Sequence, residues 1–429
     1  MKFCNILGLV ACWLGLGSPG RAADWPHWRG PNRNGIVTET SGWTGGAWPG
    51  PLAWTTSVGQ GSTSPLVVGG KVYVLGWENE HDVLRCLDLK TGKPVWRQAY
   101  RCPLYGRHHL GDESVYSGPT STPEYDPETG LLFTLSIDGD LHCWDPARGG
   151  ALLWHVNLYQ RYGVKRRPRV GQSGHRDYGY TTAPFAHRGS VIVEAGASAG
   201  NLVAFDQRTG RQLWTSQNRD PAGHAGGMSP IKVDGSPGLA VFTHRHLLVV
   251  RLDAGREGQT LAEYPWITDF ANSIATPAVH DDCVVITSDY NHKAICKLRI
   301  EPGRASRLWQ QPFSSKVCSP IIAGDRIYWA WQRARCLDLR TGEQVWEGGQ
   351  FGDPASCILT ADDRLIIWGH RGKLVLAETD RRSPGKYREL AVQHRVFQSE
   401  AWPHVVLADG GLLCKDRQGN VKCFRLGGP

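Results

Sequence analysis

Residues 86–96 read CLDLKTGKPVW and residues 336–346 read CLDLRTGEQVW, so nearly the same eleven residues occur twice in a chain of 429. Looser copies are CWDPARGGALLW (143–154), AFDQRTGRQLW (204–214) and RIEPGRASRLW (299–309). The shared pattern is an acidic residue, a turn that contains glycine, and an apolar residue before Trp. Repetition of this kind is typical of an array of similar structural units.

The repeated pattern predicts a β-hairpin. The acidic side chain can accept hydrogen bonds from N–H groups of the turn, and glycine can take the positive φ that closes it. The Trp then lies on the outgoing strand, where its large flat ring can pack against the next unit. We therefore predict that six tryptophans dock one unit on another: Trp54, Trp96, Trp154, Trp214, Trp309 and Trp346.

A second pattern precedes the hairpins. It consists of Ser or Thr near Pro, a short apolar strand, a tight turn and a β-branched or aromatic run, as in TSPLVVGGKVYVLG (63–76). Eight such segments predict an all-β, closed eight-bladed β-propeller of four-stranded antiparallel blades. The last unit ends at VKCFRLGGP (421–429) without a Trp strand, whereas PLAWTTSV (51–58) precedes the first unit. We expect this N-terminal strand to complete the last blade, which leaves no open sheet edge.

The chain begins with the features of a secretory leader. Lys2 precedes an apolar run, and small residues predict a signal peptide over 1–22 with cleavage near Ala22. The residues LVAC (9–12) offer lipidation at Cys12 as an alternative. Residues 23–50 form a Trp-rich arm, which either packs on the propeller or binds a partner, and 51–429 form the propeller. We expect export to the periplasm or cell surface, no transmembrane segment and no nucleic-acid partner.

The hairpins at 87–96, 205–214 and 337–346 resemble the quinoprotein-type propeller repeat. This repeat occurs in pyrroloquinoline-quinone (PQQ) alcohol dehydrogenases and in outer-membrane β-barrel assembly factor B and its relatives. The opening DWPHWRGPNRNG (24–35) is similar to the segment after the leader of many secreted PQQ-binding-like propellers. The resemblance covers nearly all of the mature chain and implies the fold, whereas activity depends on the loops.

Departures from the quinoprotein enzymes favour a binding function. Those enzymes carry two adjacent cysteines over the cofactor, and this chain contains neither a Cys-Cys pair nor a C-x-x-C-H haem site. The assembly-factor relatives are lipoproteins that bind protein partners without a cofactor. We therefore expect no catalytic residue, no metal and no cofactor, with PQQ plus Ca²⁺ only if the chain is an enzyme.

The long insertions between blades hold the candidate binding residues. Removal of Lys2 and Arg21 with the leader leaves 46 basic and 40 acidic residues, a net charge of +6. Segments 101–118, 159–180 and 217–228 should share one face of the propeller with several within-blade turns. Arg forms forked hydrogen bonds to anions, and aromatic rings supply stacking faces. The candidate residues are His108, His109, Glu113, Tyr162, Arg166, Arg167, His175, Arg176, Tyr178, Tyr180, His244, His246, His370 and Arg371.

Ten cysteines remain after removal of the leader, and exported proteins often contain disulfides. The repeat places five cysteines at the same position of different blades, where a small buried residue is expected and the thiols are too far apart to bond: Cys86, Cys143, Cys296, Cys336 and Cys423. Cys414 and Cys423 flank a turn symmetrically and are the candidate disulfide.

Three functions follow from these observations. The leading hypothesis is an exported, non-catalytic scaffold that engages a protein or an anionic ligand through one loop face. The first alternative is a PQQ-dependent dehydrogenase-like enzyme, and the second is a lectin-like module for an acidic polysaccharide.

Overall fold

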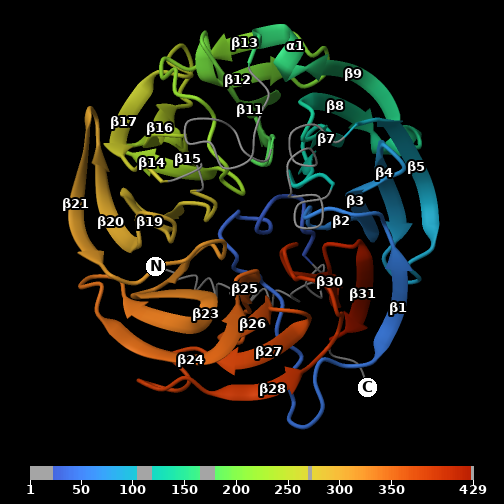
Figure 1. The fold of residues 1–429 in the computed structure, drawn as a ribbon, viewed down its shortest axis with the longest axis vertical. Coiled ribbons are helices and arrows are strands. Elements are labelled where there is room, and N and C mark those ends of the chain that lie inside the picture. Colours follow the sequence, from blue (N-terminus) through green and yellow to red (C-terminus); the bar gives the residue numbers. More distant parts are fainter. Residues whose placement is uncertain (1–22, 104–117, 165–178, 269–272, 427–429) are drawn as a thin grey trace, which may run out of the picture.

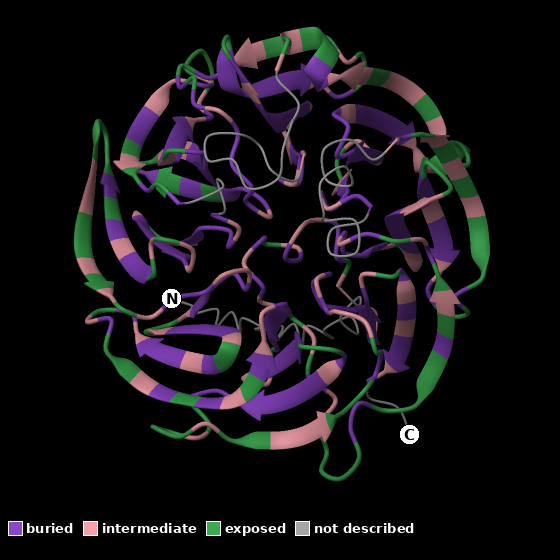
Figure 2. Ribbon diagram, viewed as in Figure 1, coloured by how far each residue is buried: buried purple, intermediate pink, exposed green. Residues whose placement is uncertain are grey.

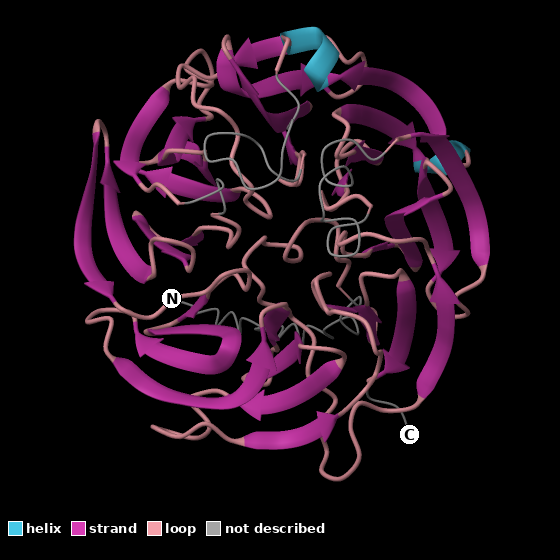
Figure 3. Cartoon of the chain, viewed as in Figure 1, coloured by secondary structure: helices cyan, strands magenta, loops and turns pink. Residues whose placement is uncertain are grey.

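The chain folds into an eight-bladed β-propeller, which confirms the predicted fold class (Figure 1). The computed structural model describes residues 23–103, 118–164, 179–268 and 273–426. Helix is limited to α1 (Leu158–Tyr162) and the 3-10 turn η1 (Pro146–Arg148) in this part of the chain (Figure 3). Neither is long and apolar enough to cross a membrane, and the described residues contain no other helix.

The first four blades follow one another along the chain, each as a simple antiparallel meander. Their strands are β2 (Leu66–Val68), β3 (Lys71–Glu78), β4 (His81–Asp88) and β5 (Pro94–Arg101); β6 (Glu124–Asp126), β7 (Leu131–Leu135), β8 (Asp140–Asp145) and β9 (Ala151–Asn157); β10 (Phe185–His187), β11 (Ser190–Ala197), β12 (Gly200–Asp206) and β13 (Gln212–Thr215); β14 (Ser229–Val233), β15 (Ser236–Phe242), β16 (His246–Arg251) and β17 (Thr260–Pro265).

The remaining blades continue this order until the ring closes. Their strands are β18 (Ala278–His280), β19 (Cys283–Ser288), β20 (Ala294–Glu301) and β21 (Arg304–Gln311); β22 (Ile321–Ala323), β23 (Arg326–Asp338) and β24 (Gln344–Gly352); β25 (Ala355–Leu359), β26 (Arg364–Gly369), β27 (Lys373–Glu378) and β28 (Glu389–Gln393); β29 (Val406–Ala408), β30 (Gly411–Lys415), β31 (Asn420–Arg425) and β1 (Leu52–Ser57).

Two blades depart from the simple meander. In the sixth, β23 contains Gln332 at a φ of 55°, and its two halves pair with different neighbours, β22 and β24. Figure 1 shows this ribbon folding back on itself, so β23 supplies the second and third strands. In the eighth blade, β1 pairs with β31, and Trp54 lies opposite Cys423. The N-terminal strand therefore completes the last blade, as predicted.

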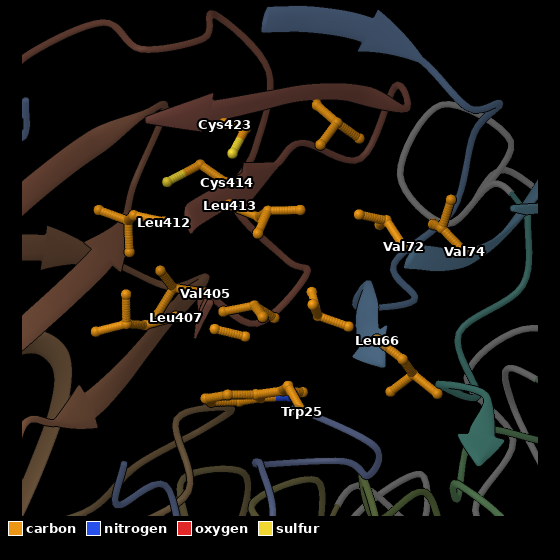
Figure 4. Close-up of a cluster of buried hydrophobic side chains, with 14 of the residues drawn as sticks. Trp25, Leu66, Val72, Val74, Val405, Leu407, Leu412, Leu413, Cys414 and Cys423 are labelled. Carbon is orange, nitrogen blue, oxygen red and sulfur yellow. The ribbon is translucent and has the colours of Figure 1, made fainter. Parts of the chain in front are cut away.

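The core lies between the blades rather than inside any one of them. The second strands of the blades are mostly buried, whereas the outermost strands contain many exposed and partly buried residues (Figure 2). Figure 4 shows one such cluster, in which Leu413 of blade eight faces Val72 of blade one, with Trp25 below them.

The repeat tryptophans lie at the boundaries between blades. The Nε1–H groups of Trp54, Trp154 and Trp309 donate to the carbonyls of Leu89, Gln207 and Leu339, at 2.7, 2.8 and 3.1 Å. Each acceptor belongs to the next blade and directly follows the Asp of its hairpin. The ring covers the glycine of the same turn, so that a methyl group on Gly92 would lie 2.6 Å from Trp54 and one on Gly210 would lie 2.8 Å from Trp154. A glycine in this turn is therefore required by the neighbouring blade.

Each outermost strand also carries a β-bulge. The register of all eight outer pairs shifts by one residue next to the Trp or the residue that replaces it. The extra residue ahead of the Trp is exposed in several blades, as with Val95, Leu213 and Leu308. A bulge interrupts the ladder and increases the local twist, so none of these edges is a flat strand.

The strand register corrects two predictions about cysteines. All ten described cysteines are free and buried, including Cys414 and Cys423. Cys414 lies opposite Lys422, and Cys423 lies opposite Leu413, so the two thiols point to opposite faces of the sheet and cannot form the expected disulfide. The repeat position assigned to Cys296 belongs to Lys297, which lies opposite Trp309.

The Trp and glycine contact can be tested within blade three. Ala at Gly210 (φ 68°) and at Gly189 (φ 74°) should each cost about 1–2 kcal/mol, because both backbones are left-handed. Only Gly210→Ala also clashes with Trp154, since Gly189 has no other residue within 4 Å of the added methyl group. We expect Gly210→Ala to lower the free energy of unfolding by a further ~1–3 kcal/mol in urea titrations. Equal losses in both variants would contradict this account of the docking contact.

Candidate functional site

The two ends of the propeller carry different connections. Turns between first and second strands and between third and fourth strands share one end, which we call the turn face. Turns between second and third strands, together with the connections between blades, share the other end, the loop face. This division follows from the antiparallel order of each blade. The three long insertions therefore leave from the loop face, and residues 104–117 and 165–178 within them lie outside the described part.

The N-terminal arm closes the central channel at the turn face. Trp25 exchanges backbone hydrogen bonds with Val67 of blade one, and Leu359 of blade seven bonds in the same way to Val37 and Gly35. The carboxylate of Glu39 accepts from the N–H groups of Asp409 and Gly410 in a turn of blade eight. Figure 1 shows the arm crossing the middle of the ring. Residues 24–41 thus cover the channel from one side to the other.

Two buried arginines anchor the arm. Arg33 forms an ion pair with Glu124 of blade two, where His27 also lies 3.0 Å from the carboxylate. Burial would raise the pKa of Glu124, but the charges of Arg33 and His27 hold it below its ordinary value. Arg29 donates to the carbonyls of Pro320 and Asn34 at 2.5 and 3.0 Å. Arm tryptophans Trp25 and Trp48 are buried, which favours packing of the arm over a free binding arm.

Trp28 projects from the arm into the channel and forms the floor of an axial pocket. Its Nε1–H donates to Thr276 Oγ1 at 2.9 Å, and its ring meets the edge of His404 with centroids 5.3 Å apart. A methyl group on Gly227 would lie 2.3 Å from the Trp28 ring, so this glycine makes room for it. The pocket encloses about 90 Å³ and is lined by Trp28, Ser62, Thr120, Thr181, His224, Gly226, Ile274, Val317 and Trp402. Most of these residues stand a few positions before the first strand of a blade, in the connections between blades. The mouth of the pocket therefore lies on the loop face.

A second recess on the loop face lies between blades six and seven. It measures about 500 Å³ and is lined by Gln332, Arg333, Gln350, Gly352, His370, Lys373 and His394. No carboxylate belongs to this lining. Glu347 and Glu389 lie just outside it, at 3.5 Å from Arg333 and from Lys373. The cleft presents cationic and amide groups suited to an anionic ligand.

A cleft of similar size between the same two blades opens on the turn face. It measures about 440 Å³, and its lining mixes Asp325, Asp363 and Asp380 with Arg326 and Arg381. Several of these charges neutralise one another, since Arg326 bonds to Asp380 at 2.7 Å and Arg381 lies 3.0 Å from Asp363. The two clefts differ in their linings, because three aspartates line the turn-face cleft and no carboxylate lines the loop-face cleft.

The structure places six of the fourteen predicted binding residues. His370 lines the loop-face cleft, and Arg371 follows it in the same exposed turn. Tyr162 lies on α1, where its hydroxyl donates to Gln212 at 2.7 Å. Tyr180 is a correction, because it is buried, packs against Tyr159 and donates to the Ala195 carbonyl. The other eight lie outside the described residues: His108, His109, Glu113, Arg166, Arg167, His175, Arg176 and Tyr178.

His244 and His246 lie in one loop-face turn of blade four but have different environments. His246 Nδ1 lies 2.6 Å from Asp220 Oδ2, while His244 is buried. Burial would raise the pKa of Asp220, but hydrogen bonds from His246 and Thr243 hold it below its ordinary value. His246 therefore serves to hold the 217–228 connection rather than to extend toward a ligand.

Sequence reasoning did not single out Trp28 or Trp402 as pocket residues, nor Arg333, Lys373 and His394 as cleft residues. One signal was present for Trp402, which stands before Pro where the other units have small or short side chains. The cleft residues come from four segments of two blades, and no sequence spacing links these segments.

The fold and its docking hairpins define a propeller built from PQQ-like repeats. A family model described as outer membrane protein assembly factor BamB matches residues 79–348, more than half of the chain, and the chain belongs to this family. The BamB of Burkholderia pseudomallei is 24% identical over 321 residues, 70% of this chain and 69% of that protein.

Two further matches delimit the similarity. The dehydrogenase subunit of a quinone alcohol dehydrogenase from Komagataeibacter europaeus is 29% identical over 172 residues, 38% of this chain but 21% of that protein. Among solved structures, BamB from Moraxella catarrhalis has a TM-score of 0.61 at 12% identity, covering 88% of this chain and all of that one. The structural match supports the fold alone.

The described residues do not fit a quinone cofactor with Ca²⁺. Sites for small molecules usually measure about 300–1,000 Å³, whereas the axial pocket encloses about 90 Å³ above the Trp28 ring. Within residues 23–103, 118–164, 179–268 and 273–426, no three or more His, Cys, Asp or Glu side chains are grouped so as to hold a metal ion.

The floor of the pocket should make the fold sensitive to acid. Burial lowers the pKa of His404, which packs on Trp25 and Trp28, from 6.5 to about 4. The unfolded chain therefore binds more protons between these values, and stability falls as pH drops from 6.5 toward 4, by about 3 kcal/mol from this group. His404→Gln should flatten the pH dependence of the urea midpoint in this range, and the partly exposed control His280→Gln should not. An unchanged slope in His404→Gln would contradict this role for His404.

Proposed function

We propose that this chain is a non-catalytic scaffold of the cell envelope that binds a partner protein through its loop face. The family is that of an outer membrane protein assembly factor, and a relative of this kind matches 70% of the chain. The leader expected at residues 1–22 agrees with export, although it lies outside the described residues. The partner would then be a protein of the same compartment.

One observation carries the choice of face. Between blades six and seven, cationic and amide side chains but no carboxylate line the loop-face cleft, whereas charges of both signs line the turn-face cleft. The glutamates that pair with Arg333 and Lys373 lie outside the loop-face lining. The arm also covers the turn-face end of the channel, so the axial pocket is left open toward the loops. Electrostatic complementarity then selects a partner segment that carries carboxylates.

The proposal predicts which positions contact the partner. His370 and Arg381 are both exposed turn residues of blade seven, on the loop face and the turn face respectively. A photoreactive amino acid at position 370 should cross-link a protein in cells that produce the chain, and one at position 381 should not. Mass spectrometry of the adduct identifies what is bound. Equal labelling from both positions would contradict a loop-face site, and capture of polysaccharide would support the lectin-like alternative instead.

Charge reversal gives a second test of the same surface. Arg333→Glu combined with Lys373→Glu should reduce the adduct at position 370 at least tenfold, while the matched turn-face change Arg381→Glu leaves it unchanged. Rising ionic strength should weaken the interaction of the native chain, because exposed charges are screened by salt. An adduct that is insensitive to both changes would mean that the cleft is not part of the interface.

A further inference from the structure

Two thiols meet at the boundary between blades six and seven. Cys318 directly precedes the Ser319-Pro320 step into β22, and Cys357 lies in β25. Their sulfur atoms are 3.7 Å apart, and each residue is only 2% exposed. This contact joins blades that are neighbours in space through residues 39 positions apart in the chain.

Both cysteines depart from the repeat. Cys318 stands two residues before the Pro that precedes the first strand of its blade, where blade one has Thr63 and blade three has Thr182. Cys357 stands where Pro precedes the equivalent strand in other blades, as Pro65 and Pro320 do. Neighbouring blades therefore replace two unrelated residue types with cysteine at the two positions that touch.

The surroundings favour reaction of one thiol. The guanidinium of Arg29 is fully buried beside the pair, and its Nε has no hydrogen-bond partner. Burial would raise the pKa of Cys318, but hydrogen bonds from Cys357 and the Ala330 N–H, together with the charge of Arg29, hold it below its ordinary value. A thiolate is the form of cysteine that attacks a disulfide.

We propose that Cys318 and Cys357 form a disulfide that links blade six to blade seven in the exported protein. The oxidant is a disulfide of the thiol-exchange class. The Cys318 thiolate attacks one of its sulfurs, which breaks the oxidant's S–S bond and releases one thiol. Cys357 then displaces the second thiol from the mixed disulfide. The pair loses two protons and two electrons, and the oxidant becomes two thiols.

The bond requires a small local movement and an open intermediate. The two sulfurs must approach from 3.7 Å to about 2.05 Å. Because both thiols are buried in the folded ring, exchange requires a local opening of the boundary between blades six and seven. The product then constrains the unfolded chain across this boundary. The inference rests on export but not on the identity of any partner.

Alkylation and mass spectrometry test the bond directly. The full chain is refolded from urea with a mixture of oxidised and reduced glutathione, then unfolded with iodoacetamide in the absence of reductant and digested. We expect one cross-linked peptide that contains Cys318 and Cys357, while Cys414 and Cys423, which face opposite sides of their sheet, are alkylated as the internal control. Alkylation of both Cys318 and Cys357 under these conditions would overturn the proposal.

Stability provides a second readout. Reductant should lower the Tm of the oxidised native chain by about 5 °C or more. The double variant Cys318→Ala/Cys357→Ala should lose this response, and Cys414→Ala should retain it. If the double variant fails to fold, the peptide map of the native chain still decides. If the cross-linked peptide is found but position 370 captures no partner protein, the disulfide is supported and the proposed loop-face function is not.

Discussion

The contact of a tryptophan ring with a glycine of the next blade recurs at five of the eight blade boundaries and is the main repeated interaction that holds the ring together. A blade presents its hairpin turn to the preceding blade, and the indole lies over the one residue without a side chain. The indole N–H also satisfies a carbonyl that the turn leaves free, as for Trp54 and Leu89. Packing and hydrogen bonding therefore set the angle between blades together. Because Trp54 lies on the N-terminal strand, the same contact also fixes the seam where the ring closes.

The fold was predictable because its determinants are local and repeated. The spacing from Asp to Trp identified the hairpins. The last unit lacks its Trp strand and an extra Trp strand precedes the first unit, which identified how the ring closes. The cysteine pair Cys414 and Cys423 was wrong because symmetry about a turn does not determine which side each residue faces. A shift of one residue in the register moves a side chain to the other face of the sheet.

The candidate site was predictable only in part, because it is assembled from distant residues. His370 was found from its turn, but its neighbours in the cleft, such as Arg333 and His394, come from another blade and from the segment after β28. The route of the arm has no periodic pattern in the sequence, and Trp28 meets Thr276 from 248 positions away. The proposed disulfide partners likewise become neighbours only when blades six and seven are packed together.

The arm separates this chain from a propeller with an open channel. An open channel leaves room for a ligand on the axis, whereas here Trp28 and its supports occupy the turn-face end. The connections that vary most in length lie on the loop face. Long and variable loops commonly carry binding residues, so a scaffold would be expected to bind its partner there.

The bulges of the outer strands have a consequence beyond the single molecule. A propeller exposes eight sheet edges on its circumference, and each flat edge would be a template for a strand from another molecule. Interrupting every ladder at the same position denies that template to neighbours, even though Val95, Leu213 and Leu308 are exposed there. The side wall is thereby kept inert at high local concentration, and association is left to the ends of the cylinder.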